Sequence, residues 1–255
     1  MNLRYIALHL NHDSGYKDPF RDNFNLHSRF ISNYLSVQIR KLKYETDGTF
    51  NMITVSPTLD IKHICRIVGE KALDACISFN REAYDQMTEY EKYDYYLQLL
   101  EDGYKICSQF KQIPLDYLLQ LHQEFRVNGY KNEWLHKKRK FKEYGIEVTL
   151  NCYFTSLDFQ LSISVNDIRN KTELISGIVI KTLPDEVCFA PLFKDIIIEK
   201  NQLCITEIQD RPKFIFNLDD IFKGNFICKI NNVGLNYNSA LSYASIGGQT
   251  NNSSS

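Results

Sequence analysis

Apolar and polar residues alternate through much of the first 55 residues, which is the pattern of half-buried β-strands. Residues 3–10 alternate in this way and predict the first strand. A second alternation over residues 35–44 leads into Asp47-Gly48, a pair that is suited to a tight type I′ turn. Residues 50–55 would then return as the partner strand. Residues 1–55 are therefore predicted to be β-rich and to contain a hairpin.

Residues 56–130 carry apolar positions at steps of three and four, which predicts about three helices. Ser56-Pro57 is suited to begin the first, because serine caps a helix and proline is tolerated at its first position. Thr88 has the capping-box spacing to Glu91 and begins the second. Pro114 begins the third. The first helix would bury Ile61, Ile64, Cys65, Val68, Ala72, Ala75, Cys76 and Phe79.

Residues 131–232 are predicted to form an antiparallel β-sheet, and the alternation over residues 146–154 and 159–165 predicts a hairpin with one wet face. Strands followed by helices and then by strands indicate the α+β class. We expect a single domain over residues 1–246 and a flexible Gly-, Asn- and Ser-rich tail at 247–255. The pattern is equally compatible with an N-terminal hairpin that joins the C-terminal sheet and with one that packs against the helices. The predicted strands of the sheet are 146–154, 159–165, 175–182, 195–200, 203–208, 213–218 and 226–230.

Composition adds limits to this picture. The 255 residues are 44% hydrophobic and 24% charged with a net charge of −1, so there is no overall bias towards nucleic acid or membrane. No apolar stretch is long enough to span a membrane, and no apolar block follows Met1 as in a signal peptide. The seven cysteines are scattered without Cys-x-x-Cys spacing, which favours free thiols in a reducing cytoplasm.

No nucleophile elbow, P-loop or dinucleotide-binding turn is present, and we expect no cofactor. His9, His12 and Asp13 are weak candidates for metal ligands, because strand positions 9 and 12 point to opposite faces. A metal-dependent hydrolase whose site is assembled from distant residues remains an alternative function. His27, His63 and His122 are interpreted as core histidines hydrogen-bonded to carbonyl groups. No local sequence around a cysteine supports a cysteine–histidine hydrolase.

An acidic, tyrosine-rich segment at residues 81–102 is the surface most suited to a partner. Exposed tyrosines provide contact area at low entropic cost, and carboxylates attract a basic partner. The leading hypothesis is a non-enzymatic protein-binding protein, for example a cytoplasmic immunity protein or antitoxin that neutralises a basic protein. The predicted contact residues are Glu89, Tyr90, Asp94, Tyr95, Glu101 and Asp102.

A basic segment at residues 136–142 offers a second alternative, nucleic-acid binding, because interleaved cations and aromatic rings suit a phosphate backbone and bases. The competing interpretation is a connector or edge strand, where lysines prevent sheet-to-sheet aggregation. We favour the connector or edge strand, since no second basic cluster reinforces the first. The residues that nucleic acid would contact are Trp134, Lys137, Lys138, Arg139 and Lys140.

Overall fold

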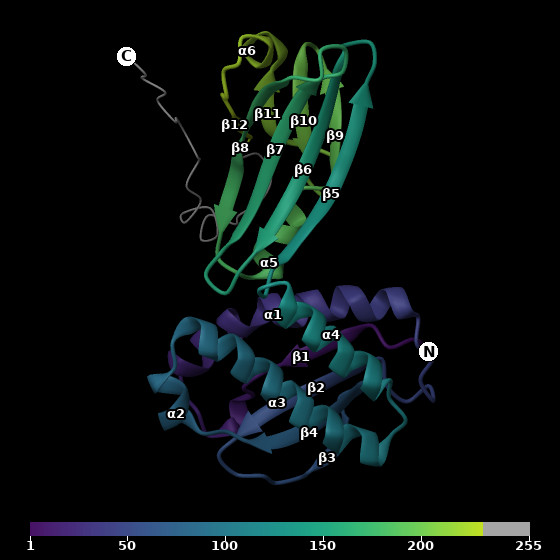
Figure 1. Cartoon of the computed structure of the whole chain (residues 1–255), viewed down its shortest axis with the longest axis vertical. Helices are drawn as coiled ribbons and strands as arrows, with labels where there is room; N and C mark the ends of the chain where they lie inside the picture. The colour runs from purple at the N-terminus through teal and green to yellow at the C-terminus, as the bar shows by residue number, and fades with distance from the viewer. Residues whose placement is uncertain (232–255) are drawn as a thin grey trace. The chain divides into compact units, whose positions relative to one another are not determined.

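The computed structural model describes residues 1–231 and confirms the α+β class (Figure 1). The chain divides into two compact units, Met1–Asn132 and a second unit from Glu133 onward. This division lies beside the predicted change from helical to β-sheet sequence at residue 130. The single domain over residues 1–246 stays a prediction, and the tail at 247–255 lies outside the described residues.

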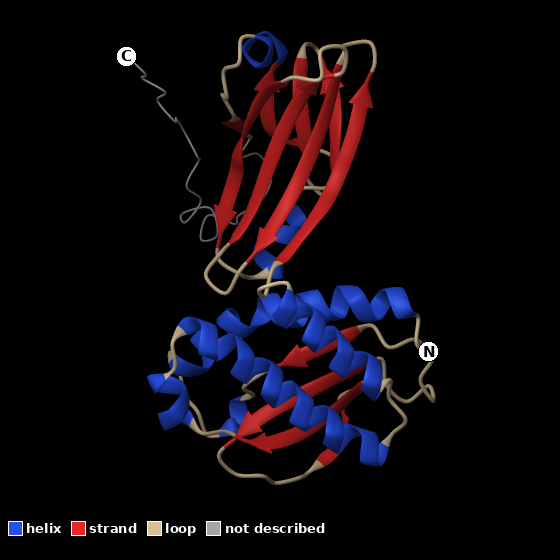
Figure 2. Cartoon of the chain, in the orientation of Figure 1, coloured by secondary structure: helices blue, strands red, loops and turns tan. Residues whose placement is uncertain are grey.

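The N-terminal unit is built on a four-stranded sheet in the order β1-β2-β4-β3 (Figure 2). The first three strands in this order are parallel to one another, and β3 pairs with β4 in the antiparallel sense. The strands are β1 (Tyr5–Leu8), β2 (Met52–Thr58), β3 (Cys65–Val68) and β4 (Ala72–Ser78). The helices are η1 (His12–Ser14), α1 (Phe20–Leu42), α2 (Arg81–Gln86), α3 (Glu89–Phe110) and α4 (Leu115–Val127).

Helix α3 packs against β2 and β4 and so defines the covered face of this sheet. A side chain at Gly103 of α3 would collide with Val55 of β2, so Val55 points at the helix. Successive residues of a strand point to opposite faces, and Ser56 therefore points away from α3. Ser56 is in register with Cys76, and Thr54 with Asp74. The side chains of Asp74 and Cys76 consequently lie on the face opposite α3.

Helix α1 replaces the strand predicted at residues 35–44, so the predicted hairpin is wrong, whereas the strand predicted at residues 50–55 is confirmed as β2. The helix lies along the free edge of β1, where Ser32 and Ser36 accept hydrogen bonds from the backbone N–H groups of Leu8 and Ile6. Ser28 and Ser36 donate to carbonyl groups of the same strand. These serines are buried or half-buried although they are polar. They interrupt the apolar repeat of three and four residues by which a helix is recognised in sequence.

The helix predicted over residues 61–79 is also wrong, because this segment forms β3 and β4. Five consecutive residues of β4, from Leu73 to Ile77, are buried, so the strand shows no alternation. Ile61 and Ile64 are 47% and 58% exposed in the preceding loop instead of facing a core. The helices predicted from Thr88 and Pro114 are confirmed as α3 and α4, and Gly129 follows α4 with a φ of 66°.

The second unit consists of two antiparallel sheets whose buried side chains face each other. Their orders are β5-β6-β7-β8 and β12-β11-β10-β9. The first sheet holds β5 (Asn132–Phe141), β6 (Ile146–Phe154), β7 (Phe159–Asp167) and β8 (Glu173–Thr182). The second holds β9 (Asp195–Glu199), β10 (Gln202–Thr206), β11 (Pro212–Asn217) and β12 (Lys229–Ile230). Up to residue 231 this unit also contains three short helices: α5 (Glu186–Phe189), η2 (Ala190–Leu192) and α6 (Leu218–Phe222).

Within residues 1–231, no helix combines the length and the apolar character that crossing a membrane requires. All seven cysteines are free thiols.

Candidate metal site in the N-terminal unit

A pocket of about 410 Å³ opens on the face of the sheet opposite α3. Residues 11–14, which follow β1, and residues 56–58, at the end of β2, form one side of it. Asp74 and Cys76 of β4 and the β2–β3 loop complete it. Ligands of α/β sheets commonly bind beyond the carboxyl ends of parallel strands, and this pocket occupies such a position. Its remaining lining residues are Asp60, Lys62, His63, Arg66 and Val68.

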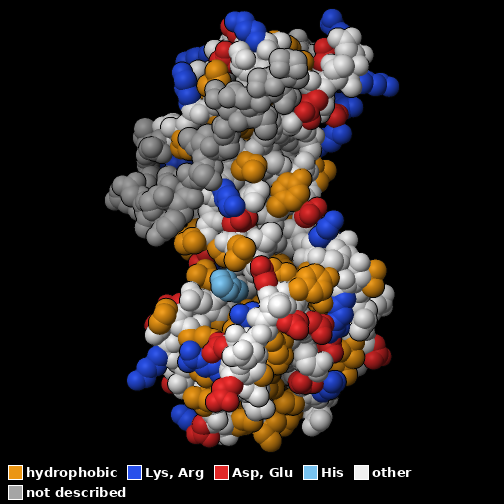
Figure 3. Space-filling view, turned by 60° about the vertical axis from the view of Figure 1, so that its left-hand side comes forward, with side chains coloured by type: hydrophobic (Ala, Val, Ile, Leu, Met, Phe, Trp, Pro, Cys, Tyr) orange, Lys and Arg blue, Asp and Glu red, His pale blue; other side chains and the backbone are white. Residues whose placement is uncertain are grey.

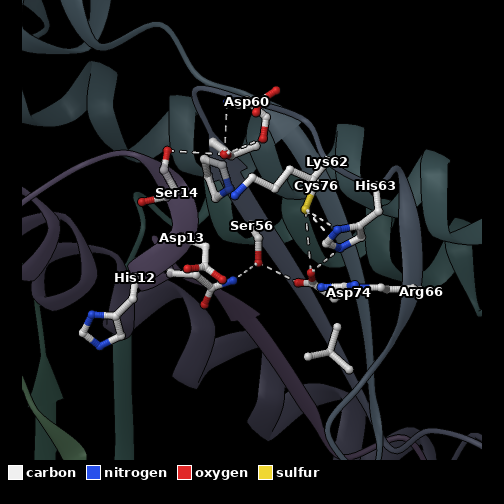
Figure 4. A pocket seen from close by; sticks show the side chains of 14 residues that line it. His12, Asp13, Ser14, Ser56, Asp60, Lys62, His63, Arg66, Asp74 and Cys76 are labelled. Carbon is white, nitrogen blue, oxygen red and sulfur yellow. Dashed lines mark hydrogen bonds and ion pairs between the residues drawn. The ribbon is translucent and has the colours of Figure 1, made fainter.

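Three potential metal ligands converge in this pocket: His63, Asp74 and Cys76 (Figure 4). Nε2 of His63 lies 3.2 Å from Oδ2 of Asp74 and 3.3 Å from Sγ of Cys76. Sγ of Cys76 lies 3.8 Å from the same oxygen of Asp74. Asp74 and Cys76 are buried, and the side chain of His63 is 21% exposed. The cluster is therefore mostly enclosed but can be reached through the pocket.

The three distances match one face of a tetrahedral zinc site. Zinc ligands lie about 2.0–2.3 Å from the ion, so neighbouring ligand atoms of a tetrahedron lie about 3.3–3.8 Å apart. Imidazole nitrogen, carboxylate oxygen and thiolate sulfur all bind zinc, and a catalytic site keeps its fourth position open. The arrangement can thus hold a divalent transition-metal ion with one position turned to the pocket.

The same geometry argues against a cysteine nucleophile with a histidine base. In such a system one ring nitrogen faces the nucleophile and the other faces the orienting carboxylate. Here Nε2 of His63 is the ring nitrogen nearer to Cys76 and also the one that contacts Asp74. Burial and the neighbouring Asp74 carboxylate raise the pKa of the Cys76 thiol to about 11. A free thiolate nucleophile is therefore disfavoured near neutral pH.

Two polar residues fix the orientation of Asp74. Ser56 donates a hydrogen bond of 2.6 Å to Oδ1 of Asp74, and Asn11 donates one of 2.8 Å to the Ser56 hydroxyl oxygen. Oδ2 of Asp74 is left to face His63 and Cys76. Hydrogen bonds of this kind orient metal ligands in proteins and contribute to metal affinity.

The weak metal candidates His9, His12 and Asp13 are only partly brought together. His12 and Asp13 line the pocket, whereas His9 does not. The ring of His9 makes contacts with Asn11 and Asn25, and Nδ1 of His12 lies 2.5 Å from Arg21. Figure 4 shows His12 well apart from the converging ligands.

Sequence reasoning missed His63, which it assigned to a core together with His27 and His122. His63 lies in the β2–β3 loop at the pocket, and His27 is half-buried on α1. His122 is fully buried as expected, but its Nδ1 bonds the carboxylate of Glu101 at 3.1 Å instead of a carbonyl. The sequence signal for this site is Asp74-x-Cys76, because residues two positions apart on a β-strand point to the same face and can bind one ion.

The six predicted partner-binding residues all lie on α3. Asp94 and Glu101 form ion pairs with Arg126 of α4 at 2.6 and 2.8 Å. Asp102 pairs with Lys105, and Glu89 accepts a hydrogen bond from Tyr93. Acidic and basic side chains also lie next to one another on the face shown in Figure 3. Much of the acidic charge is thus balanced within the unit.

The two predicted tyrosines differ in accessibility. Tyr90 is 60% exposed and packs edge-on against Tyr130 with ring centroids 4.9 Å apart. Tyr95 is half-buried, and its ring contacts Phe79. Tyr90 therefore offers the more accessible aromatic surface.

The basic segment forms β5, which stands at the end of its sheet as the favoured interpretation expected. Lys137 and Arg139 pair with Asp195, at 3.3 and 3.5 Å. Lys138 and Lys140 pair with Glu147, at 2.7 and 3.3 Å. The half-buried Trp134 packs near Phe159. Nucleic-acid binding by these five residues stays a prediction.

Comparison with known proteins gives no further assignment. No protein-family model matches the chain, and neither a curated protein nor a solved structure matches it. The function must therefore be argued from the site itself.

Proposed function

We propose that the N-terminal unit binds a divalent transition-metal ion, with Zn²⁺ as the best match, and that the chain is a metal-dependent hydrolase. The ligands are Nε2 of His63, Oδ2 of Asp74 and Sγ of Cys76. The observation that carries the proposal is their separation of 3.2–3.8 Å, which fits one face of a tetrahedral site.

The open position explains the choice of a hydrolase. A zinc ion with three protein ligands lowers the pKa of the water that occupies its fourth position and so supplies a nucleophile at neutral pH. In hydrolysis the hydroxyl of that water joins the electrophilic atom of the substrate, and its proton leaves with the departing group. No redox partner is required. The pocket volume of about 410 Å³ suits a small substrate.

Metal analysis of the purified full chain tests the proposal. After incubation with Zn²⁺ and removal of the excess, we expect elemental mass spectrometry to find one bound zinc ion per chain. His63→Ala and Cys76→Ser are expected to abolish stoichiometric binding, because each removes one of three ligands. Circular dichroism establishes that the variants are folded.

Two variants serve as matched controls. Cys65→Ser changes a thiol of β3 that is in register with Ala75 and so lies on the α3 face, and His27→Ala changes a histidine of α1. Both are expected to retain zinc. Absence of zinc from the wild-type chain, or equal loss in Cys65→Ser and Cys76→Ser, would refute the proposed site.

Binding of a basic protein partner in the cytoplasm, as by an immunity protein or antitoxin, is a second proposal. The exposed ring of Tyr90, held by Tyr130, favours it. Charge reversal at Glu89 and Asp102 together with Tyr90→Ala is expected to reduce capture of a basic partner. Arg169→Glu in the second unit is the control. Unchanged capture by the triple variant would contradict this proposal.

A further inference from the structure

Within the part of the chain that the structure describes, two cationic side chains of the pocket lack an ion-pair partner. Lys62 and Arg66 both line it, and both are exposed. Among residues 1–231, neither forms an ion pair or a side-chain hydrogen bond, although Asp13, Asp60 and Asp74 line the same pocket. Figure 4 shows Lys62 extending across the pocket, and Arg66 of β3 is in register with Asp74 of β4.

We infer that the pocket recognises the phosphoryl group of a small phosphate monoester, held by Lys62 and Arg66 against the metal ion. This inference rests on the metal site proposed above. The planar guanidinium group of Arg66 matches two phosphate oxygens at once, and the ammonium group of Lys62 supplies a compact charge. Cations and a divalent metal ion around a transferring phosphoryl group are the usual means of stabilising its charge.

The acidic residues of the pocket make this recognition depend on the metal ion. The carboxylates of Asp13, Asp60 and Asp74 outnumber the two cations and repel an anion. A divalent ion bound between Asp74 and Cys76 offsets that charge and adds a direct attraction for phosphate oxygens. We therefore expect phosphate to bind the zinc-loaded chain far more tightly than the metal-free chain.

The corresponding reaction is hydrolysis of the phosphate ester. The oxygen of water forms a new bond to phosphorus, and the bond between phosphorus and the ester oxygen breaks. A proton from the water is transferred to the departing alkoxide, so the products are an alcohol and inorganic phosphate. Inorganic phosphate is thus the product and a suitable probe of the site.

Calorimetric titration of the zinc-loaded full chain with inorganic phosphate tests the inference, after dialysis has removed unbound zinc. In the double variant Lys62→Ala/Arg66→Ala we expect affinity to fall by roughly a hundredfold, from the loss of two charge-assisted contacts. Zinc content should remain that of the wild type, since neither residue is a ligand. Lys41→Ala/Lys71→Ala removes the same charge elsewhere on the N-terminal unit and should leave the affinity unchanged.

The outcomes separate the two claims. Loss of phosphate affinity with retained zinc in the double variant supports the inference. Unchanged phosphate affinity in that variant, or no phosphate binding by a wild-type chain that does hold zinc, overturns the phosphoryl site and leaves the metal site intact. A wild-type chain that holds no zinc overturns both.

Discussion

Ser56 on β2 and Asp74 on β4 are joined by a hydrogen bond of 2.6 Å, although 18 residues separate them in the chain. The bond occupies one carboxylate oxygen of Asp74 and turns the other towards His63 and Cys76. Ser56, which the sequence predicts to cap a helix, thus orients a ligand of the proposed metal site.

Ser56→Ala is therefore expected to weaken zinc binding by about 10–100-fold while leaving stoichiometric binding at saturating zinc. Without the serine hydroxyl, the carboxylate of Asp74 can rotate away from the ligand position. Competition with a chelator of known affinity measures the change. Ser108→Ala on α3 is the control, because the Ser108 hydroxyl donates to the carbonyl of Lys105 within the same helix. Equal zinc affinities in wild type and Ser56→Ala would show that this bond does not support the site.

Gly103→Ala is expected to lower the free energy of unfolding by about 1–3 kcal/mol, because overpacking forces neighbouring groups apart. An added Cβ would collide with Cγ1 and Cγ2 of Val55, so α3 must move away from β2. Denaturant unfolding of the full chain measures the loss.

The second substitution Val55→Ala makes room for that Cβ. In the Val55→Ala background, Gly103→Ala should therefore cost less than it does in the wild type. Gln98→Ala, an exposed change on the same helix, is the control. Strictly additive costs in the double variant would contradict the proposed clash.

Glu101 is expected to make the N-terminal unit sensitive to acid. Hydrogen bonds from His122 and Arg126 hold the pKa of its carboxyl group at about 2, well below the ordinary value of 4.5. The folded state therefore binds a proton less readily than the unfolded state. The resulting stability is fully present above pH 4.5 and is lost as the pH falls towards 2.

The size of this effect is at most about 3.5 kcal/mol, because the pKa falls from 4.5 to about 2 and each unit of pKa corresponds to roughly 1.4 kcal/mol. Burial lowers the pKa of His122, and Nδ1 of its ring donates a hydrogen bond to the Glu101 carboxylate. Glu101→Gln should flatten the fall in stability between pH 4.5 and 2 in denaturant titrations at several pH values. Glu82→Gln on α2 is the control, and a Glu101→Gln curve parallel to wild type would contradict the assignment.

Strand β5 is expected to bind DNA only after its carboxylate partners are neutralised. Asp195 and Glu147 each pair with two of its cations. In Asp195→Asn/Glu147→Gln we expect salt-dependent binding of mixed-sequence DNA that exceeds that of the wild type. Fluorescence anisotropy at increasing salt measures it. If the wild-type chain itself binds DNA with an affinity that falls steeply with salt, this prediction is wrong and residues 134–140 bind nucleic acid without any substitution.

The sequence predicts the α+β class and the elements whose signals are local. The capping box of Thr88 begins α3, and the alternation in residues 146–165 becomes β6 and β7. Such signals need no distant partner, because a cap bonds its own first turn and an alternating strand has one wet face.

Only the tertiary structure shows which elements form where residues bond or pack against segments that are distant in the sequence. Ser28, Ser32 and Ser36 look polar in sequence, yet they bond the edge of β1 and belong to the packed side of a helix. Strand β4 is buried on both faces, so its period cannot be told from that of a helix. The metal site depends on these elements. Asp74 and Cys76 share a face once β4 is a strand, and the β2–β3 loop carries His63 to meet them.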